Sequence, residues 1–259
     1  MTVKPNGAYT NTNLKNKIAI VTGGSKGLGK AIARVLAQEG VNVAICARRI
    51  GELTKTAQEI EHGTGAEVLS VQADMKNVDD IQRLVAATVK EFGALDILVN
   101  NAASTIHGKI LELEDEAWYN RFDGKVMGYI RCAREAVPHM IQRGGGRIVN
   151  ISGAAARTAS NSRAAANGVA NAAVANLTKF LADDVAKHGI LVNCVHPSGI
   201  PTTLKIQASV TAERLTPIGR VIRPEELANV VVFLCSDMAS AVTGQSICVD
   251  GGAGRGISY

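Results

Sequence analysis

The sequence has no apolar segment long enough to cross a bilayer. Its longest uncharged apolar runs, such as residues 18–21 and 230–235, fall far short of the ~20 residues that a spanning helix needs. The N-terminus also lacks a basic segment followed by an apolar one, so we expect no secretory signal. These absences predict a protein with no membrane partner.

Aromatic residues are scarce, at 3% of the chain, and the basic residues are scattered along it. The formal net charge is +5, from 28 Lys and Arg against 23 Asp and Glu. Without a cationic stripe or an aromatic stacking platform, we expect no nucleic-acid partner.

Cysteine and histidine show no arrangement typical of a disulfide framework or a metal site. The five cysteines are odd in number, far apart and mostly embedded in apolar stretches. No cysteines or histidines stand at metal-ligand spacing, so no metal is expected. The sequence therefore predicts reduced, buried thiols in a cytoplasmic protein. The cysteines are Cys46, Cys132, Cys194, Cys235 and Cys248.

The sequence does have the composition and patterning of one globular α/β domain. Its 259 residues are 46% hydrophobic and 20% charged, which excludes intrinsic disorder. After a polar tail of residues 1–13, which we expect to be loosely held, short β-branched runs alternate with segments of helical period. No repeat or linker interrupts them. This pattern predicts one domain over residues 14–259, with a Rossmann-type, doubly wound, seven-stranded parallel sheet covered by helices on both faces.

The expected elements follow the alternation directly. We expect strands at residues 17–22, 42–47, 67–72, 97–100, 147–151, 191–195 and 246–249. We expect helices at residues 29–38, 53–61, 78–91, 117–142, 164–187 and 224–236, with glycine or proline at their junctions.

A glycine-rich turn lies between the first expected strand and the first helix. Glycines at this point let backbone N–H groups and a helix N-terminus approach a pyrophosphate, so the turn predicts a dinucleotide site. An ordinary tight turn is the alternative. The expected cofactor-binding residues of this turn are Gly23, Ser25, Lys26, Gly27, Leu28 and Gly29.

Cofactor choice is expected to be set at the end of the second strand, where the adenosine ribose would lie. An acidic residue there would bind the ribose 2′-hydroxyl and repel a 2′-phosphate. This chain has Arg48 and Arg49, with Lys26 facing the same place, which is a cationic pocket suited to a phosphate. The residues predict NADP(H). Solvated surface arginines are the alternative.

Motifs in the rest of the chain complete a family pattern. They comprise Asp74 after the third strand, Asn-Asn-Ala-Ala at residues 100–103, Pro-Ser-Gly-Ile-Pro-Thr at 197–202, Arg-Pro-Glu-Glu at 223–226, Thr-Gly-Gln at 243–245 and Asp-Gly-Gly at 250–252. With the glycine turn, they make residues 14–252 resemble the short-chain dehydrogenase/reductases.

The resemblance implies further cofactor contacts and an assembly. Asp74 and Met75 would hold the adenine, Asn101 and Ala102 would pass under the adenosine ribose, and Ile200 and Thr202 would contact the nicotinamide carboxamide. Pro197 is followed by Ser198 where the family has glycine, so the nicotinamide loop is expected to be altered. The resemblance also implies a homotetramer or homodimer.

The chain departs from the family at its chemistry. The family uses an Asn, Ser, Tyr and Lys tetrad with a Tyr-x-x-x-Lys signature, and no tyrosine here has a lysine four residues on. By the surrounding motifs, Asn167 takes the tyrosine position, Asn171 the lysine position and Lys125 the asparagine position. Gly153 stands at the serine position, with Ser152 before it.

The chemistry of these replacements gives the candidate catalytic residues Lys125, Asn167, Asn171 and Ser152. A carboxamide is not an acid near neutral pH, so Asn167 would polarise a carbonyl without supplying a proton. A lysine placed in the cleft would have a lowered pKa and could act as an acid or base. The alternative for Lys125 is an ammonium that reaches solvent from a helix face. Tyr129, four residues on, is expected to be packed at a helix interface.

The residues leave the function open among three possibilities. The first is an NADP(H)-dependent oxidoreductase that reduces a carbonyl or a conjugated C=C of a small to medium substrate without the usual tyrosine. The second is a catalytically weak or inactive NADP(H)-binding protein, acting as a sensor or structural partner. The third is a non-redox lyase or hydratase on the same scaffold.

Overall fold

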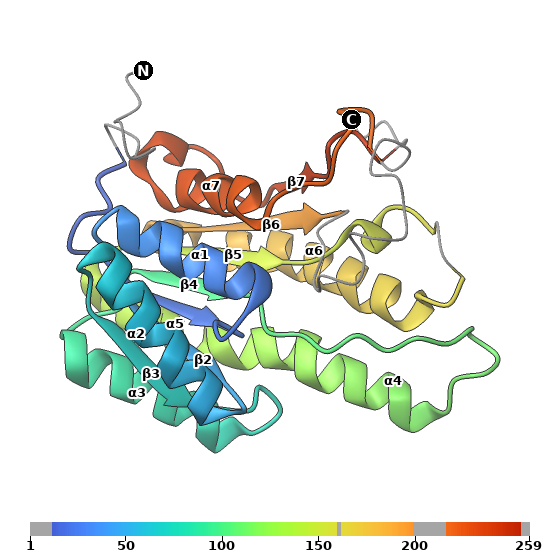
Figure 1. Cartoon of the computed structure of the whole chain (residues 1–259), viewed down its shortest axis with the longest axis horizontal. Helices are drawn as coiled ribbons and strands as arrows, with labels where there is room; N and C mark the ends of the chain where they lie inside the picture. Colours follow the sequence, from blue (N-terminus) through green and yellow to red (C-terminus); the bar gives the residue numbers. More distant parts are fainter. Residues whose placement is uncertain (1–11, 160–161, 199–215, 255–259) are drawn as a thin grey trace.

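The computed structural model describes residues 12–159, 162–198 and 216–254. In that part of the chain, seven parallel strands form one sheet in the order β3-β2-β1-β4-β5-β6-β7 (Figure 1). The prediction of a seven-stranded parallel sheet is confirmed. The strands are β1 Ile18–Thr22, β2 Asn42–Ala47, β3 Val68–Gln72, β4 Ile97–Asn100, β5 Gly146–Ile151, β6 Ile190–Pro197 and β7 Ser246–Val249.

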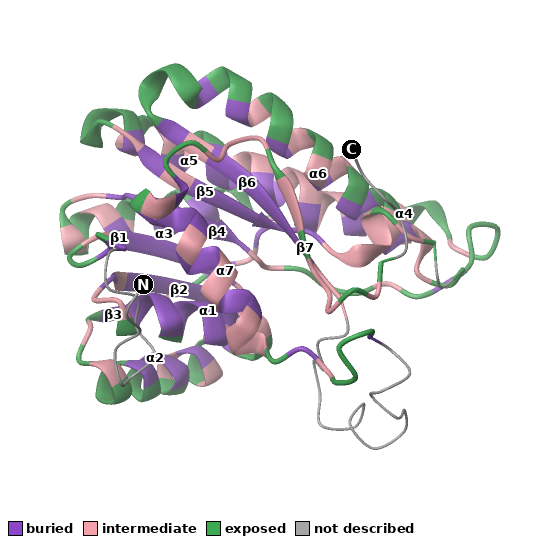
Figure 2. Ribbon diagram, turned by 90° about the horizontal axis from the view of Figure 1, so that it is seen from above, coloured by how far each residue is buried: buried purple, intermediate pink, exposed green. Residues whose placement is uncertain are grey.

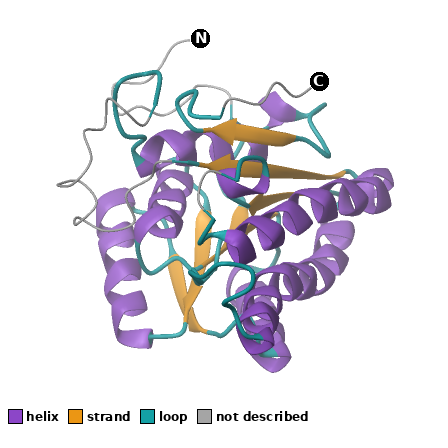
Figure 3. Cartoon of the chain, turned by 90° about the vertical axis from the view of Figure 1, so that its right-hand side faces the viewer, coloured by secondary structure: helices purple, strands orange, loops and turns teal. Residues whose placement is uncertain are grey.

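Helices cover both faces of the sheet, as the alternating pattern predicts (Figure 3). Helices α1, α2 and α7 pack on one face, and α3, α5 and α6 on the other. The chain order reverses between β1 and β4, so a crevice is expected at the carboxyl ends of these two strands. The helices are α1 Gly27–Gln38, α2 Ile50–Thr64, α3 Val78–Phe92, α4 Asp115–Phe122, α5 Gly128–Arg143, α6 Ala165–Val185 and α7 Pro224–Cys235.

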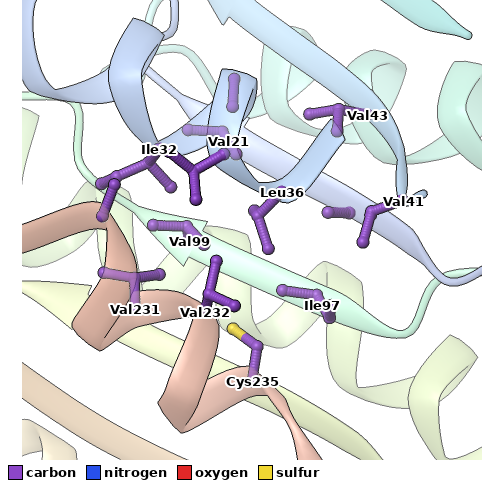
Figure 4. Packing of buried hydrophobic residues seen from close by; sticks show 14 of the residues in the cluster. Val21, Ile32, Leu36, Val41, Val43, Ile97, Val99, Val231, Val232 and Cys235 are labelled. Carbon is purple, nitrogen blue, oxygen red and sulfur yellow. The ribbon is translucent and has the colours of Figure 1, made fainter. Parts of the chain in front are cut away.

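The sheet is buried on both faces, which explains its β-branched runs. Figure 4 shows Val21 of β1 and Val99 of β4 packed between Ile32 of α1 and Val231 of α7. The central strands are buried while the outer sides of the helices are exposed (Figure 2). Strand bounds therefore agree with the expected ranges to within one or two residues.

One expected helix is interrupted. The sequence predicts a single helix over residues 117–142, but a π-helical turn, η1 (Asp123–Met127), separates α4 from α5. Gly128 follows this turn, and a Cβ there would lie 3.1 Å from both Cβ and the carbonyl oxygen of Met75. The wider turn therefore fits a close approach to the segment after β3, a tertiary contact that helical periodicity does not reveal.

The end of the N-terminal tail is also held more firmly than expected. Thr12 is buried and its hydroxyl donates to Glu39 at 2.9 Å. The Asn13 side chain donates to Asp237 at 2.9 Å. These two residues belong with the folded domain, and residues 1–11 lie outside the described chain.

The described residues bear on two further expectations. Four cysteines are buried and unpaired, as expected, whereas Cys248 is exposed on the edge strand β7. No helix among the described residues has both the length and the apolar character that a membrane crossing requires.

Candidate active site

The glycine turn between β1 and α1 has the shape of a phosphate cradle. Gly23 has a φ of +70°, and a Cβ on Gly29 would lie only 2.2 Å from the Gly23 carbonyl oxygen, so both positions require glycine. Gly27 also has a positive φ, of +54°, but a Cβ there would meet nothing within 4 Å. The turn is therefore tight on its inner side and open on its outer side.

The N-terminus of α1 is free to take a negative charge. Its N-cap, Lys26, makes no side-chain cap, and no acidic residue lies in the first turn. The first amides of the helix and the positive end of its dipole therefore face the open side of the turn. Ser25 is buried and its carbonyl accepts from Thr56 at 2.7 Å, while Leu28 packs against the core, so these two residues hold the turn in place.

The segment after β4 is fastened to the same turn. The backbone N–H groups of Asn101 and Ala102 donate to the Thr22 hydroxyl at 2.9 and 3.0 Å. The Asn101 side chain donates to the Thr22 carbonyl at 2.9 Å. A Cβ on Gly23 would lie 2.9 Å from the Ala102 Cα. Asn101 and Ala102 therefore lie against the turn after β1, at the strand-order reversal.

Positive charge gathers at the end of β2. Arg48 is exposed and forms no ion pair with a carboxylate of the described chain, whereas Arg49 pairs with Glu52 at 2.7 Å. The hydrogen bond from Arg49, helped by the charges of Arg49 and Lys26, lowers the pKa of Glu52. Arg49 is thus partly neutralised, and Arg48 with Lys26 supplies the charge that a 2′-phosphate would meet.

The remaining expected cofactor residues lie after β3 and β6, and their surroundings differ. Asp74 is fixed by its turn, since its backbone N–H donates to Asp80 and its carboxylate accepts from the Lys76 N–H. The Met75 side chain instead turns into the core, with its sulfur 3.6 Å from that of Cys132, so only its backbone is left for an adenine. Pro197 ends β6 beside Val249. Ile200 and Thr202 lie outside the described residues.

Lys125 enters the site from η1 and is almost completely buried, with 3% of its surface exposed. Its Nζ donates to the carbonyl oxygens of Ile151 at 2.9 Å and Ser152 at 3.4 Å, at the end of β5. Burial, and next the charge of Arg121, lower its pKa to about 7. The alternative of an ammonium that reaches solvent is therefore wrong.

Tyr129 packs beneath this lysine. Its ring centroid lies 5.3 Å from the Lys125 Nζ, and its hydroxyl donates to the Ile151 carbonyl at 2.9 Å. Burial raises the pKa of the phenol far above its usual range. Tyr129 is a packed side chain, as expected, and its hydroxyl proton is used in a hydrogen bond to the backbone.

Asn167, at the family's tyrosine position, is hydrogen-bonded to the backbone of Ile106. Its amide oxygen accepts from the Ile106 N–H at 3.2 Å, and its amide nitrogen donates to the Ile106 carbonyl at 2.7 Å. The nearby Gly108 N–H donates to the Arg163 carbonyl at 2.8 Å. Asn167 therefore clamps the segment after β4 onto the start of α6, and this contact uses one of the two N–H donors of its amide nitrogen.

Asn171, at the lysine position, fits against Gly153. A Cβ on Gly153 would lie 2.5 Å from the Asn171 Nδ2, so Asn171 occupies room that a serine at 153 would need. The Asn171 Oδ1 is buried without a hydrogen-bond partner. The Ser152 hydroxyl donates to the Asn171 carbonyl at 2.9 Å and is buried. Ser152 and Asn171 are thus adjacent, and the Ser152 hydroxyl is engaged by the backbone.

The structure adds Arg121, His196 and Cys194 to the site. Arg121 is 4% exposed, lies four residues before Lys125 on the same helical face and donates through Nη1 to the Ser104 carbonyl. His196 places Nδ1 3.3 Å from the Gly153 carbonyl, and burial lowers its pKa. Burial raises the pKa of Cys194 to about 11, so this thiol is neutral. The spacing of Arg121 from Lys125 was the available signal, since one basic residue directs attention to the other.

Comparison with known proteins agrees with this architecture. Residues 23–254 match the family described as Enoyl-(Acyl carrier protein) reductase. The 3-oxoacyl-[acyl-carrier-protein] reductase FabG of Staphylococcus aureus is 34% identical over 241 residues, which cover 91% of this chain and 97% of that protein. Human Dehydrogenase/reductase SDR family member 4 is 35% identical over 246 residues, covering 92% of this chain and 88% of that protein. The chain belongs to the short-chain dehydrogenase/reductase family.

A solved structure of this short-chain dehydrogenase/reductase kind shows the same fold with ligands bound. The L-sorbose reductase of Gluconobacter frateurii, in complex with NADPH and L-sorbose, has a TM-score of 0.89 and 32% identity. The likeness covers 96% of this chain and all of that one. The present short-chain dehydrogenase/reductase therefore shares the fold of an NADPH-bound oxidoreductase over almost its whole length.

Proposed function

We propose that the chain is an NADP(H)-dependent oxidoreductase that reduces a carbonyl or a conjugated C=C of a small to medium substrate without a catalytic tyrosine. The cradle supports the cofactor part of this proposal. The open turn at Gly27 and the uncapped α1 N-terminus suit the pyrophosphate, and Arg48 with Lys26 suits a 2′-phosphate. When bound, the nicotinamide would supply the hydride.

The observation that carries the catalytic part is Lys125. Its ammonium is buried at the carboxyl end of β5, and its pKa near 7 allows Nζ to hold or release a proton at neutral pH. In its protonated form it adds positive potential where a reduced substrate oxygen would carry negative charge, and burial strengthens that effect. The Ile151 and Ser152 carbonyls keep Nζ in position.

The test is NADPH oxidation by stopped flow against quinones, diketones and enones. We expect slow turnover in the wild type, since general acid catalysis by a tyrosine contributes roughly 10²–10⁴ in rate. Lys125→Met should remove this turnover and leave NADPH binding in place, while Lys90→Met, on an exposed part of α3, should change neither. Full turnover in Lys125→Met would refute the assigned role.

One observation favours a second candidate, an NADP(H)-binding protein without turnover. The clamp of Asn167 on Ile106 engages the residue that replaces the tyrosine. Tight NADPH binding without oxidation by any substrate of the panel would support this candidate over the oxidoreductase.

We also propose a cytoplasmic homodimer or homotetramer. The buried, unpaired thiols support a reducing compartment. Exposed apolar side chains on α6, Val169 at 48% and Phe180 at 66%, support a helix face that a second copy covers. Light scattering on the purified protein measures the assembly directly.

A further inference from the structure

Two buried cations lie side by side in the candidate active site. Arg121 and Lys125, here called the buried cation pair, are 4% and 3% exposed and are four residues apart on one face of the α4–η1 segment. The charge of Arg121 is felt at Lys125, where it is the next-largest influence after burial. Two like charges have therefore been brought close together and withdrawn from water.

No carboxylate of the described chain neutralises this pair. Neither Arg121 nor Lys125 takes part in an ion pair there. The nearest acids in sequence are engaged elsewhere, since Asp123 pairs with Arg131 at 2.8 Å and Glu116 accepts from Asn120 at 2.6 Å. A buried charge without a partner is strongly unfavourable, and an anion bound beside Arg121 and protonated Lys125 would offset that cost.

The hydrogen bonds of Arg121 show which edge of its guanidinium is available. Nη1 donates to the Ser104 carbonyl. Nε is buried without a hydrogen-bond partner, and no described hydrogen bond uses Nη2. Nε and Nη2 together form the edge that binds a planar carboxylate through two parallel hydrogen bonds.

This edge of the Arg121 guanidinium lies where a substrate would bind. Ser104 follows the Asn101 and Ala102 segment, beyond the carboxyl end of β4, and Lys125 is anchored at the carboxyl end of β5. In Figure 1 these ends lie toward the side where α4 extends past the sheet. Ligands of open α/β sheets bind at this edge. Arg48, which we propose for the cofactor phosphate, follows the separate strand β2.

We propose that the buried cation pair binds the carboxylate of the substrate, so that the substrate class is a small oxo acid or α,β-unsaturated acid. Arg121 donates hydrogen bonds from Nε and Nη2 to the two carboxylate oxygens, and Lys125, when protonated, supplies the second positive charge. This inference rests on the proposed oxidoreductase function, because it assigns the acid group of the compound that would be reduced.

The test compares matched acid and ester probes by isothermal titration calorimetry on the protein saturated with NADP⁺ and on the protein alone. The probes are acetoacetate with methyl acetoacetate, and crotonate with methyl crotonate. We expect each acid to bind the wild type at least about tenfold more tightly than its ester. Equal affinity of acid and ester would overturn the proposal.

Variants of Arg121 make the test specific. Arg121→Met should remove the preference for the acid, and Arg121→Lys, which keeps the charge but loses the two-pronged edge, should retain only part of it. Arg34→Met removes an equal charge from an exposed ion pair on α1 and should leave the preference unchanged. An undiminished acid preference in Arg121→Met would contradict the proposal, and Arg121→Lys decides the matter should the methionine variant fail to fold.

Two further measurements distinguish a carboxylate site from a general anion site, and the substrate class from the cofactor. Sodium phosphate and sodium chloride are tested for displacement of acetoacetate at equal ionic strength. Displacement with an affinity similar to that of acetoacetate would show a general anion site and overturn the carboxylate assignment. NADPH binding is followed independently by its fluorescence. Acid preference without NADPH binding would defeat the proposed function alone, whereas NADPH oxidation with no acid preference would defeat this inference alone.

Discussion

At the scale of single residues, burial decides what each group of the site can do. Lys125 and Tyr129 both donate to the Ile151 carbonyl, yet burial lowers the pKa of the lysine and raises that of the phenol. Each shift favours the neutral form. The pKa of the lysine therefore lies in the pH range where proton transfer is useful, while the pKa of the tyrosine lies above it.

The pKa of Lys125 predicts a pH dependence of stability. Its folded value is about 7 against an ordinary 10.5, so between these values the unfolded chain binds a proton that the folded chain does not. The free energy of unfolding should therefore rise with pH, by at most about 1.4 kcal/mol per pH unit. Urea unfolding between about pH 7 and 8.5 measures this slope.

The window of that experiment separates Lys125 from other groups. Below it, His196 titrates, because burial lowers its pKa from 6.5. Above it, the buried thiols act in the opposite sense, because burial raises the pKa of Cys46 and of Cys235 from 9.0 to about 12. Lys125→Met should remove the slope and Lys90→Met should keep it. An unchanged slope in Lys125→Met would show that folding does not lower the pKa of this lysine.

At the scale of elements, the glycine turn between β1 and α1 depends on the absence of a single Cβ atom. A Cβ on Gly29 would meet backbone, the Gly23 carbonyl oxygen at 2.2 Å, which cannot move without opening the turn. Gly63, in the last turn of α2, has nothing within 4 Å of the corresponding position. The same substitution should therefore have opposite effects at the two sites.

Gly29→Ala should destabilise the protein by about 1–3 kcal/mol through overpacking. Gly63→Ala should stabilise it by about 0.4–1 kcal/mol, because alanine restricts the unfolded chain and suits a helix. Thermal unfolding of both variants checks the pair. Similar stability in the two variants would mean that the turn has room that the structure does not show.

The elements also show which parts of the molecule can be predicted from sequence. Buried strands such as β2 and β4 match their expected bounds because both faces select apolar, β-branched residues. The π-helical turn does not follow from the sequence pattern; the residue after it, Gly128, lies close to Met75, which is distant in sequence.

The candidate site also has features that follow from the sequence and features that depend on tertiary contacts. The register of Lys125 follows from the family motif, but its burial and its carbonyl partners depend on how η1 meets β5. The clamp of Asn167 depends on where the segment near Ile106 returns to α6. The four-residue spacing of Arg121 from Lys125 is visible in the sequence, but its burial depends on the folded chain.

At the scale of the whole molecule, the proposed cofactor site draws on segments from both halves of the sheet. The turn after β1, the arginines after β2 and the segment after β4 all border the crevice where the strand order reverses. A ligand held by all of them would bind the folded chain and not the unfolded one, and would stabilise the entire domain.

NADPH should therefore raise the melting temperature more than NADH at equal concentration. At about 100 times its dissociation constant, the added stability is about 2.7 kcal/mol. Arg48→Asp should abolish the advantage of NADPH, because a carboxylate at the end of β2 repels a 2′-phosphate. Differential scanning fluorimetry makes the measurement. Unchanged NADPH protection in Arg48→Asp would assign selectivity to residues other than Arg48.

The fit of Asn171 against Gly153 constrains how this active site can change over evolution. With Nδ2 only 2.5 Å from where a Cβ on residue 153 would stand, a serine can appear at 153 only after residue 171 has changed or turned aside. Because Nδ2 is the far end of a flexible side chain, residue 153 can gain a Cβ only where Asn171 turns aside or is replaced, so the two positions are structurally coupled.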